Sequence, residues 1–333
     1  VQTQGWMRGC MVNNKPATIA VILLLLFICG SIWLIFQYVS AEKQRDLEAW
    51  QSRLSIMAES QQYAVEAWFD QQLENIDALA NNPLLQLYVT QRDQSVARDD
   101  ETGRGQLHHL KNLINATADH ADVFTPIKKI NSNVENKVND GIAIVNSTGV
   151  LLATRYFPID DIEVAKSFQS AIDSKSFFIS TIYDSADRQP RLIIVVPVRS
   201  VQSLSLDDIK AAVVAVINPE DNLYKLLLKE WVTIRSEETL LVSYDDRRVN
   251  YLSPLKNGYQ LFYGQPRSGD ISAKNIADSS VLEYIGENVI VQDYRNIGLL
   301  ATARKIRNTT MTLVQKIDVS EALAESNSHQ QFI

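Results

Sequence analysis

Cysteine is almost absent from this sequence of 333 residues, which contains only Cys10 and Cys29 and none from residue 41 onward. The region after residue 41 therefore cannot form a disulfide framework or a cysteine-based zinc site. The lack of cysteine in that region is compatible with an oxidising compartment.

The sequence also lacks an excess of basic charge. It contains 32 lysine and arginine residues against 39 aspartate and glutamate residues, for a formal net charge of −7. A nucleic-acid partner would require a basic face, so this balance argues against nucleic-acid binding. Residues 1–16, in contrast, contain Arg8 and Lys15 and no acidic residue. A small basic end on a large acidic body is typical of a chain that crosses a membrane.

Catalytic signatures are missing as well. The sequence has no nucleophile elbow, no phosphate-binding loop and no kinase signature. The glycines at 103 and 105 lack the third glycine and the preceding strand of a dinucleotide-binding loop. The histidines match no standard spacing of metal ligands, so we expect solvated helix surface and no metal site; they are His108, His109, His120 and His329. We predict that the chain is not an enzyme and binds no cofactor.

One long apolar segment, residues 17–38, contains no charged residue. At 1.5 Å per residue such a helix crosses about 30 Å of hydrocarbon. Trp33 and Tyr38 lie toward its far end, where aromatic side chains favour the membrane interface. Because Arg8 and Lys15 precede the segment, the positive-inside rule places the N-terminus in the cytoplasm and residue 41 onward outside.

A cleaved signal peptide is the alternative interpretation of this segment, with residues 39–41 as a tolerable cleavage site. The apolar run exceeds the roughly 7 to 15 residues of a signal-peptide core, which favours an uncleaved anchor. The bulk of the chain is exported under either interpretation.

Residues 41–81 have the pattern of one long helix that ends before Pro83. Apolar and small residues recur at alternating spacings of three and four. The stripe consists of Leu47, Trp50, Leu54, Met57, Gln61, Ala64 and Trp68. It can pack on the chain's own domain, or it can form the seam of a parallel dimer. The pattern leaves both open, and we expect a homodimer.

The remaining sequence alternates strand and helix patterns and contains two similar units about 100 residues apart. Each unit pairs a strand–turn–strand with two later strands, and then runs through Asn218 or Asp318 into a helix. Strands are predicted at residues 141–146, 150–154, 177–183, 191–199, 209–217, 239–244, 249–253, 288–294, 299–306 and 310–317, and helices at 107–118, 162–172, 220–230 and 319–324. Two antiparallel sheets with helices on their faces give an α+β architecture.

This arrangement resembles the double Cache sensor domain of bacterial receptors, a family with a PAS-like fold. The resemblance covers residues 41–324 and is carried by short segments in a fixed order. They are Ile182-Tyr183-Asp184, Gln189-Pro190, residues 195–198, residues 236–242, residues 252–255, Asp293-Tyr294-Arg295, residues 300–303 and residues 313–318 with Glu321-Ala322.

The resemblance implies a domain organisation that begins in the cytoplasm and leads into the periplasm. The expected parts are a cytoplasmic N-terminus (1–16), a transmembrane helix (17–38), the sensor domain (41–324) made of a long helix (41–81), a membrane-distal lobe (82–232) and a membrane-proximal lobe (233–324), and a linker (325–333). A second membrane helix and an output domain would follow in such receptors, so the chain is expected to be a fragment. The predicted location is the bacterial inner membrane, with the sensor domain in the periplasm.

The resemblance further implies a small-molecule pocket in the distal lobe. Arg155, Tyr156, Tyr183 and Asp184 lie at or near predicted strand ends that would border it. An arginine can hold a carboxylate, and an aspartate can hold an amine. The structural alternative for Arg155 is a surface ion pair with a nearby acid, Asp160 or Asp161.

The amino-acid-binding members of the family carry an Arg-x-Trp-Tyr signature. The corresponding stretch here begins Arg155-Tyr156-Phe157, so the signature does not support an amino-acid ligand.

Two functions remain open from the sequence. The first is the ligand-sensing portion of a receptor with a histidine kinase, diguanylate cyclase or chemotaxis output. In that case ligand binding in the distal lobe would shift helices across the membrane. The second is a periplasmic interaction or dimerisation module without a small ligand.

Overall fold

The computed structural model describes residues 15–94, 105, 108, 110–116, 141–147, 149–155, 162–183, 190–201, 208–220, 222–227, 234–245, 248–254, 284–292 and 297–324. The chain divides into two compact units. One comprises Val1–Trp50 with Ala322–Ile333, and the other comprises Gln51–Glu321. The second unit contains both sheets.

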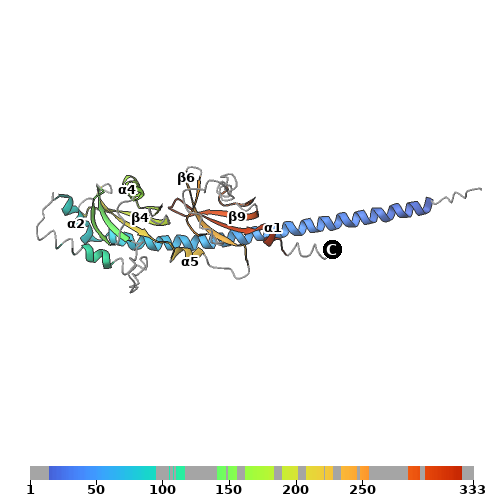
Figure 1. The fold of residues 1–333 in the computed structure, drawn as a ribbon, viewed down its shortest axis with the longest axis horizontal. Helices are drawn as coiled ribbons and strands as arrows, with labels where there is room; N and C mark the ends of the chain where they lie inside the picture. Colours follow the sequence, from blue (N-terminus) through green and yellow to red (C-terminus); the bar gives the residue numbers. More distant parts are fainter. Residues whose placement is uncertain are drawn as a thin grey trace, which may run out of the picture. The chain divides into compact units, whose positions relative to one another are not determined.

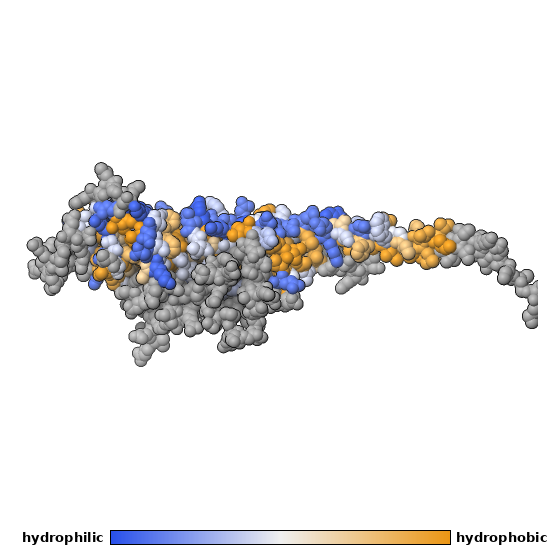
Figure 2. All heavy atoms as spheres, turned by 90° about the horizontal axis from the view of Figure 1, so that it is seen from above, coloured by the Kyte–Doolittle hydropathy of each residue, from blue (hydrophilic) through white to orange (hydrophobic). Residues whose placement is uncertain are grey.

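The longest element is the helix α1, which runs over Lys15–Ala80. Its 66 residues correspond to about 99 Å of helix. The described part of its N-terminal stretch exposes large apolar side chains from Ile22 to Phe36, visible as a hydrophobic surface in Figure 2. The most apolar window has a mean hydropathy of 2.4 and is only 6% buried, so this helix is long and apolar enough to cross a membrane.

The long helix ends where the sequence predicts. Asn81 and Asn82 close the last turn through backbone bonds to Asp77 and Leu79. The Asn82 side chain then accepts hydrogen bonds from the backbone N–H groups of Leu84 and Leu85 at 2.9 and 3.4 Å. It is therefore the N-cap of α2 (Pro83–Gln94), with Pro83 at the first helical position.

Two five-stranded antiparallel sheets follow, and both have the same strand order. The first is ordered β2-β1-β5-β4-β3, and the second β7-β6-β10-β9-β8. Their strands are β1 (Gly141–Asn146), β2 (Leu151–Arg155), β3 (Phe178–Tyr183), β4 (Pro190–Arg199), β5 (Ile209–Ile217), β6 (Glu238–Asp245), β7 (Arg248–Tyr251), β8 (Asn288–Gln292), β9 (Gly298–Lys305) and β10 (Met311–Asp318). The repeat inferred from the sequence is thus a repeat of topology. We call the first sheet with α2, α4 (Ile162–Ser174) and α5 (Leu223–Leu227) the first lobe, and the second sheet the second lobe.

The central strands of the first sheet are buried on both faces. Along β5, Val213 belongs to one core cluster and its neighbour Val214 to another. The first cluster contains apolar residues of α1, α2 and both sheets. The second lies under α4 (Ile162–Ser174), which covers the opposite face (Figure 1). Because side chains alternate along a strand, one sheet serves two separate packing surfaces.

The stripe predicted along the long helix packs inward over its middle part. Leu54, Gln61 and Trp68 are 1%, 6% and 9% exposed. The interpretation that the stripe packs on the chain's own domain is therefore correct for these three residues. They face the interior because burying an apolar helix face against the sheets removes it from water.

The second lobe is attached to α1 by polar contacts from the end of β9 and the residues that follow it. Gln62 donates to the carbonyl oxygen of Lys305 at 3.0 Å, and Arg304 donates to the Ser55 hydroxyl at 2.6 Å. Asp70 forms an ion pair with Arg307 at 2.6 Å. The contacts recur along one side of the helix, which fixes the position of this part of the second lobe against α1.

The second lobe also contains buried polar groups. Gln315 has no exposed surface; it donates to the Glu237 carboxylate at 2.7 Å and accepts from the Thr239 hydroxyl at 2.6 Å. On the opposite face of the sheet, Lys316 pairs with Glu238 at 3.2 Å. Gln315 and Lys316 are thus both compensated by partners, as burial of polar groups requires.

Two predicted helices correspond to short elements among the described residues. The described part of the helix predicted at 220–230 is α5 (Leu223–Leu227), preceded by a turn in which Asn218 accepts from the backbone of Glu220 at 3.1 Å. The helix predicted at 319–324 is α7 (Val319–Ala322). Residues 228–233 lie outside the described part of the chain.

Candidate ligand-binding site in the first lobe

The register of the first sheet brings two predicted site residues to the same end of it. Arg155, the last residue of β2, pairs with Ile142 at the start of β1. Tyr183, the last residue of β3, pairs with Pro190 at the start of β4. Since β2 and β3 are the two outer strands, four strand spacings of about 4.8 Å place these backbones about 19 Å apart. The other two predicted site residues, Tyr156 and Asp184, lie outside the described residues.

Arg155 is held by a neighbouring helix. Its guanidinium donates to the carbonyl oxygen of Asn115 at 3.0 Å. Asn115 belongs to the described helical residues 110–116. Arg155 therefore has a structural role in tying this helix to the sheet. The acids that the sequence offered as its partners, Asp160 and Asp161, lie outside the described residues.

Arg191 is a candidate that the sequence reasoning missed. It lies near the start of β4, at the same end of the sheet, and is only 4% exposed. By strand alternation it shares the α4 face with Ile193 and Val195. Arginine is almost never buried unless its charge is compensated. In the sequence, this arginine stands at the start of a long apolar strand. That position alone does not show whether its side chain is buried or exposed to water.

Tyr224, on α5, links this end of the first lobe to the second lobe. It is buried, and its hydroxyl donates to the carbonyl oxygen of Leu252. Burial raises the pKa of Tyr224 above its ordinary value of 10.0; the positive charge of Arg191 lowers it in part, and Glu220 raises it further. The hydroxyl therefore stays protonated and remains a donor at any physiological pH.

The α4 face of the sheet is apolar around its centre. Val164, Phe168 and Ala171 of α4 pack against the strands beneath. The strand residues are Ile193, Val195, Ala212, Val214 and Val216. Arg191 shares this face by strand alternation, and its guanidinium donates to the carbonyl oxygen of Pro190 at 3.4 Å.

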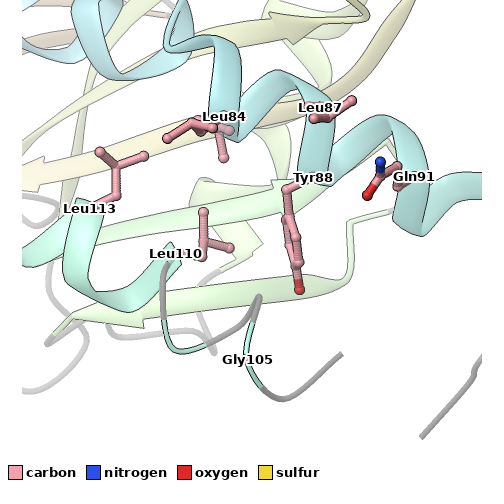
Figure 3. Close-up of a pocket in the computed structure, with 8 residues that line it drawn as sticks. Leu84, Leu87, Tyr88, Gln91, Gly105, Leu110 and Leu113 are labelled. Carbon is pink, nitrogen blue, oxygen red and sulfur yellow. The ribbon is translucent and has the colours of Figure 1, made fainter. Parts of the chain in front are cut away.

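A separate pocket opens on the other face, between α2 and the helical residues near 110 (Figure 3). Its volume is about 260 Å³, and its described lining residues are Leu84, Leu85, Leu87, Tyr88, Gln91, Gly105, Leu110 and Leu113. In Figure 3 the Tyr88 ring extends from α2 toward the segment that carries Gly105. Five of the eight lining residues are leucines.

No metal centre is formed by the described residues: no group of three or more histidine, cysteine, aspartate or glutamate side chains among them could hold an ion. Of the four histidines, only His108 is described; it lies on an exposed helical turn beside Asn112 at 3.3 Å.

No protein-family model and no curated protein matches the chain. Solved structures do match. The sensory domain of the Campylobacter jejuni chemoreceptor Tlp3 with isoleucine bound is 14% identical, with 84% of this chain and 97% of that one covered at a TM-score of 0.54. The ligand-binding domain of Pseudomonas fluorescens CtaA with L-isoleucine is 12% identical (85% and 98% covered, TM-score 0.53).

A third match is the ligand-binding domain of the Pseudomonas aeruginosa amino-acid chemoreceptor PctC with GABA. It is 12% identical, with 80% of this chain and 99% of that one covered at a TM-score of 0.51. Because these sequence identities are low, the matches show that the folds are similar and do not indicate which ligand this chain binds. The two sheets of equal strand order and the long helix α1 match chemoreceptor sensor domains over nearly their whole length, and the chain therefore has the double Cache fold.

Proposed function

We propose that this chain is the extracytoplasmic ligand-sensing part of a bacterial membrane receptor, anchored by residues 17–38. The observation that carries the proposal is the combination of the double Cache fold with a helix α1 whose N-terminal stretch is apolar and exposed. A chemotaxis output is the one that the structural neighbours favour; a kinase or cyclase output would use the same sensor. The sensor has no catalytic role of its own in this proposal.

The ligand in this proposal is a small molecule with an anionic group, bound in the first lobe beside Arg191. A buried guanidinium can hold a carboxylate through two parallel hydrogen bonds. Arg155 and Tyr183 end two strands at the same end of the sheet. Together with Tyr156 and Asp184, which lie outside the described residues, they remain proposed contacts. The neighbours' isoleucine and GABA also carry a carboxylate.

Signalling in this proposal passes through Tyr224. A ligand that changes the charge balance around Arg191 alters the surroundings of the Tyr224 ring, and the Tyr224 hydroxyl holds the carbonyl of Leu252 in the second lobe. The second lobe ends in β10 and α7, which continue into the chain end. A ligand shifts such a system only as far as its affinities for the two arrangements differ.

The experiment is a thermal-unfolding screen of the full chain in lipid nanodiscs against small carboxylates and amines. A ligand at a hundred times its Kd stabilises the protein by about 2.7 kcal/mol, a readily measured increase in Tm. Arg191→Gln should abolish the shift caused by a carboxylate ligand. Arg199→Gln, at the opposite end of the same strand, should leave it unchanged. Loss of the shift in both variants would contradict the proposed role of Arg191.

A homodimer is proposed through the outward side of α1. Ile56 and Tyr63 lie seven residues apart and are 64% and 76% exposed. A heptad spacing of exposed apolar residues fits a seam between two parallel helices. Tyr63→Glu should convert a dimer in nanodiscs or detergent into a monomer, as measured by light scattering. An unchanged mass would contradict this seam.

The alternative function is a protein-interaction module without a small ligand. The apolar packing of α4 on the centre of the first sheet favours it, because that face is filled by side chains. A screen without any thermal shift, together with a partner captured by crosslinking in the periplasm, would support this alternative over direct sensing.

A further inference from the structure

The pocket that α2 forms with Gly105, Leu110 and Leu113 lies outside the proposed ligand site. Leu85, Tyr88 and Leu110 line it and belong to the core cluster on the α1 face of the first sheet. The residues of α4 pack on the opposite face, and Arg191 shares that face by strand alternation with Ile193 and Val195. The sheet therefore separates the two places, and a molecule in this pocket would not contact Arg191.

The chemistry of the pocket sets the charge of what it can hold. None of its described lining residues is charged: they are five leucines, a tyrosine, a glutamine and a glycine. Transferring an ionised carboxylate or ammonium into such surroundings is strongly unfavourable without a partner of opposite charge. Amino acids, which carry both charges, are therefore poor candidates. An uncharged molecule meets no such penalty.

The volume of the pocket sets the size. A closed apolar cavity of about 150 Å³ holds benzene, and drug-sized ligands need about 300 to 1,000 Å³. At about 260 Å³, the pocket lies between these limits. One ring with a short substituent, or a short branched chain, fits this volume. The amide of Gln91, which lies on the exposed side of α2, can exchange hydrogen bonds with one uncharged polar group.

The surroundings of the pocket show apolar surface that the fold leaves uncovered. Leu84 is 54% exposed and Leu87 is 39% exposed, whereas Leu85 between them is buried. Residues three apart lie on the same side of a helix, so the two exposed leucines form one apolar strip along the pocket. A molecule in the pocket would cover part of that strip.

We propose that this pocket is a second binding site of the first lobe, specific for small uncharged molecules with an apolar body and one hydroxyl or carbonyl group. It is separate from the site beside Arg191 and takes a different chemical class of ligand. The first lobe then has two ligand-binding sites, one for charged molecules and one for uncharged, apolar molecules.

The test uses p-cresol as the probe and the full chain in nanodiscs. Gly105→Leu adds a large apolar side chain at a residue that lines the pocket, and a Cβ added at Gly105 meets no atom within 4 Å, so the substitution displaces no neighbour. Ala165→Leu, on the exposed side of α4, adds the same side chain elsewhere and is the matched control. Partition of p-cresol into the lipid affects all three proteins equally.

We expect saturation-transfer NMR to detect p-cresol bound to the wild type and to Ala165→Leu with the same Kd. The Kd should be at least tenfold higher for Gly105→Leu. Leu84→Ser, which removes one wall of the pocket from a half-exposed position, should weaken binding independently, and circular dichroism checks that each variant is folded. Equal binding by wild type and Gly105→Leu, or no binding by the wild type, would overturn the proposal. Weaker binding by Ala165→Leu would do so too.

The proposed carboxylate site beside Arg191 is tested by a separate measurement. A thermal shift caused by a carboxylate ligand should persist in Gly105→Leu, because the filled pocket lies on the other face of the sheet. Failure of one proposal therefore leaves the other standing.

Discussion

The hydroxyl of Tyr224 donates a hydrogen bond to the main-chain carbonyl of Leu252. The donor belongs to α5 of the first lobe, and the acceptor follows β7 in the second. Both residues are buried. A bond between two buried groups on different lobes ties the position of one sheet to that of the other.

Removing this bond should weaken the fold and the coupling between the lobes. Tyr224→Phe leaves the Leu252 carbonyl buried without this donor, which costs about 1–3 kcal/mol of unfolding free energy. Denaturant titration measures the loss. Tyr284→Phe, the same change on a ring that is 50% exposed, should alter stability by less than about 0.5 kcal/mol. Equal effects of the two substitutions would contradict a specific role for the Tyr224 hydroxyl.

The same tyrosine predicts a dependence on alkaline pH. Since burial raises the pKa of Tyr224 in the folded state, its contribution to stability is present below pH 10.0 and is lost as the pH rises above that value. The unfolded chain then releases a proton that the folded chain retains. Tyr224→Phe should therefore lose less stability than the wild type between neutral pH and alkaline pH. Parallel curves for the two proteins would contradict the raised pKa.

Glu321 predicts a dependence on acidic pH. Its carboxylate accepts from the backbone N–H groups of Arg235 and Ser236 at 2.8 and 2.7 Å. Burial alone raises the pKa of Glu321, but the hydrogen bonds from Ser236 and Arg235, with the charge of Arg235, outweigh it and lower the pKa below the ordinary 4.5.

The contribution of Glu321 to stability is therefore present above pH 4.5 and is lost as the pH falls through the lowered value. Glu321→Gln should reduce stability at pH 7 and flatten the stability curve below pH 5. Thermal unfolding over a pH series measures both effects. If the stability of the variant falls as steeply below pH 5 as that of the wild type, the Glu321 carboxylate does not contribute to the acid dependence.

Two ion pairs should differ in their contribution to stability because one is buried within the second lobe and the other is an exposed contact between that lobe and α1. The side chains of Lys316 and Glu238 are 3% and 15% exposed, and those of Arg307 and Asp70 are 60% and 56% exposed. Lys316→Met leaves Glu238 without this cation and should cost about 3–5 kcal/mol. Arg307→Met should cost about 1 kcal/mol or less. The double variant with Met at 316 and 238 should recover much of the loss, and a failure to recover would point to packing and not to charge.

Gln315 tests the buried polar network of the second lobe. Gln315→Leu removes a donor to Glu237 and an acceptor for Thr239, so two neighbouring groups lose that partner. We expect a loss of about 2–4 kcal/mol in denaturant titrations. Gln62→Leu, which removes two hydrogen bonds at a half-exposed position, to Glu66 and to the Lys305 carbonyl, should cost less. An equal or smaller loss for Gln315 would mean that water replaces the missing partners.

Sequence periodicity predicted most of the strands because each is short, apolar and bounded by turn residues. The turn after β1 is an example: Gly149 has a positive φ of 85°, and the Asn146 side chain accepts from Val150 at 2.7 Å. Glycine and asparagine are residue types that favour such turns, so the turn could be predicted from the sequence. The stop of α1 before Pro83 was predictable for the same kind of reason.

Strand order and the candidate site were less accessible to the sequence. The order β2-β1-β5-β4-β3 depends on which strands pair over long separations, and local periodicity does not encode that choice. Arg191 looked like the polar end of a strand, although the fold buries it. Arg155 lies at the predicted strand end. Its hydrogen bond to the Asn115 carbonyl oxygen could not be predicted, because Asn115 belongs to a helix 40 residues earlier in the sequence. Its role in ligand binding stays a prediction.

The strand order has a consequence for how the chain is made. In each lobe the last strand, β5 or β10, lies in the middle of the sheet and pairs with both neighbours. Before that strand leaves the ribosome, each lobe consists of two separate hairpins, β1–β2 with β3–β4, or β6–β7 with β8–β9. Neither sheet can close until its final residues are synthesised, so each lobe is completed late and in one step. A nascent chain halted before Met311 would expose the open edges of both hairpins of the second lobe to aggregation.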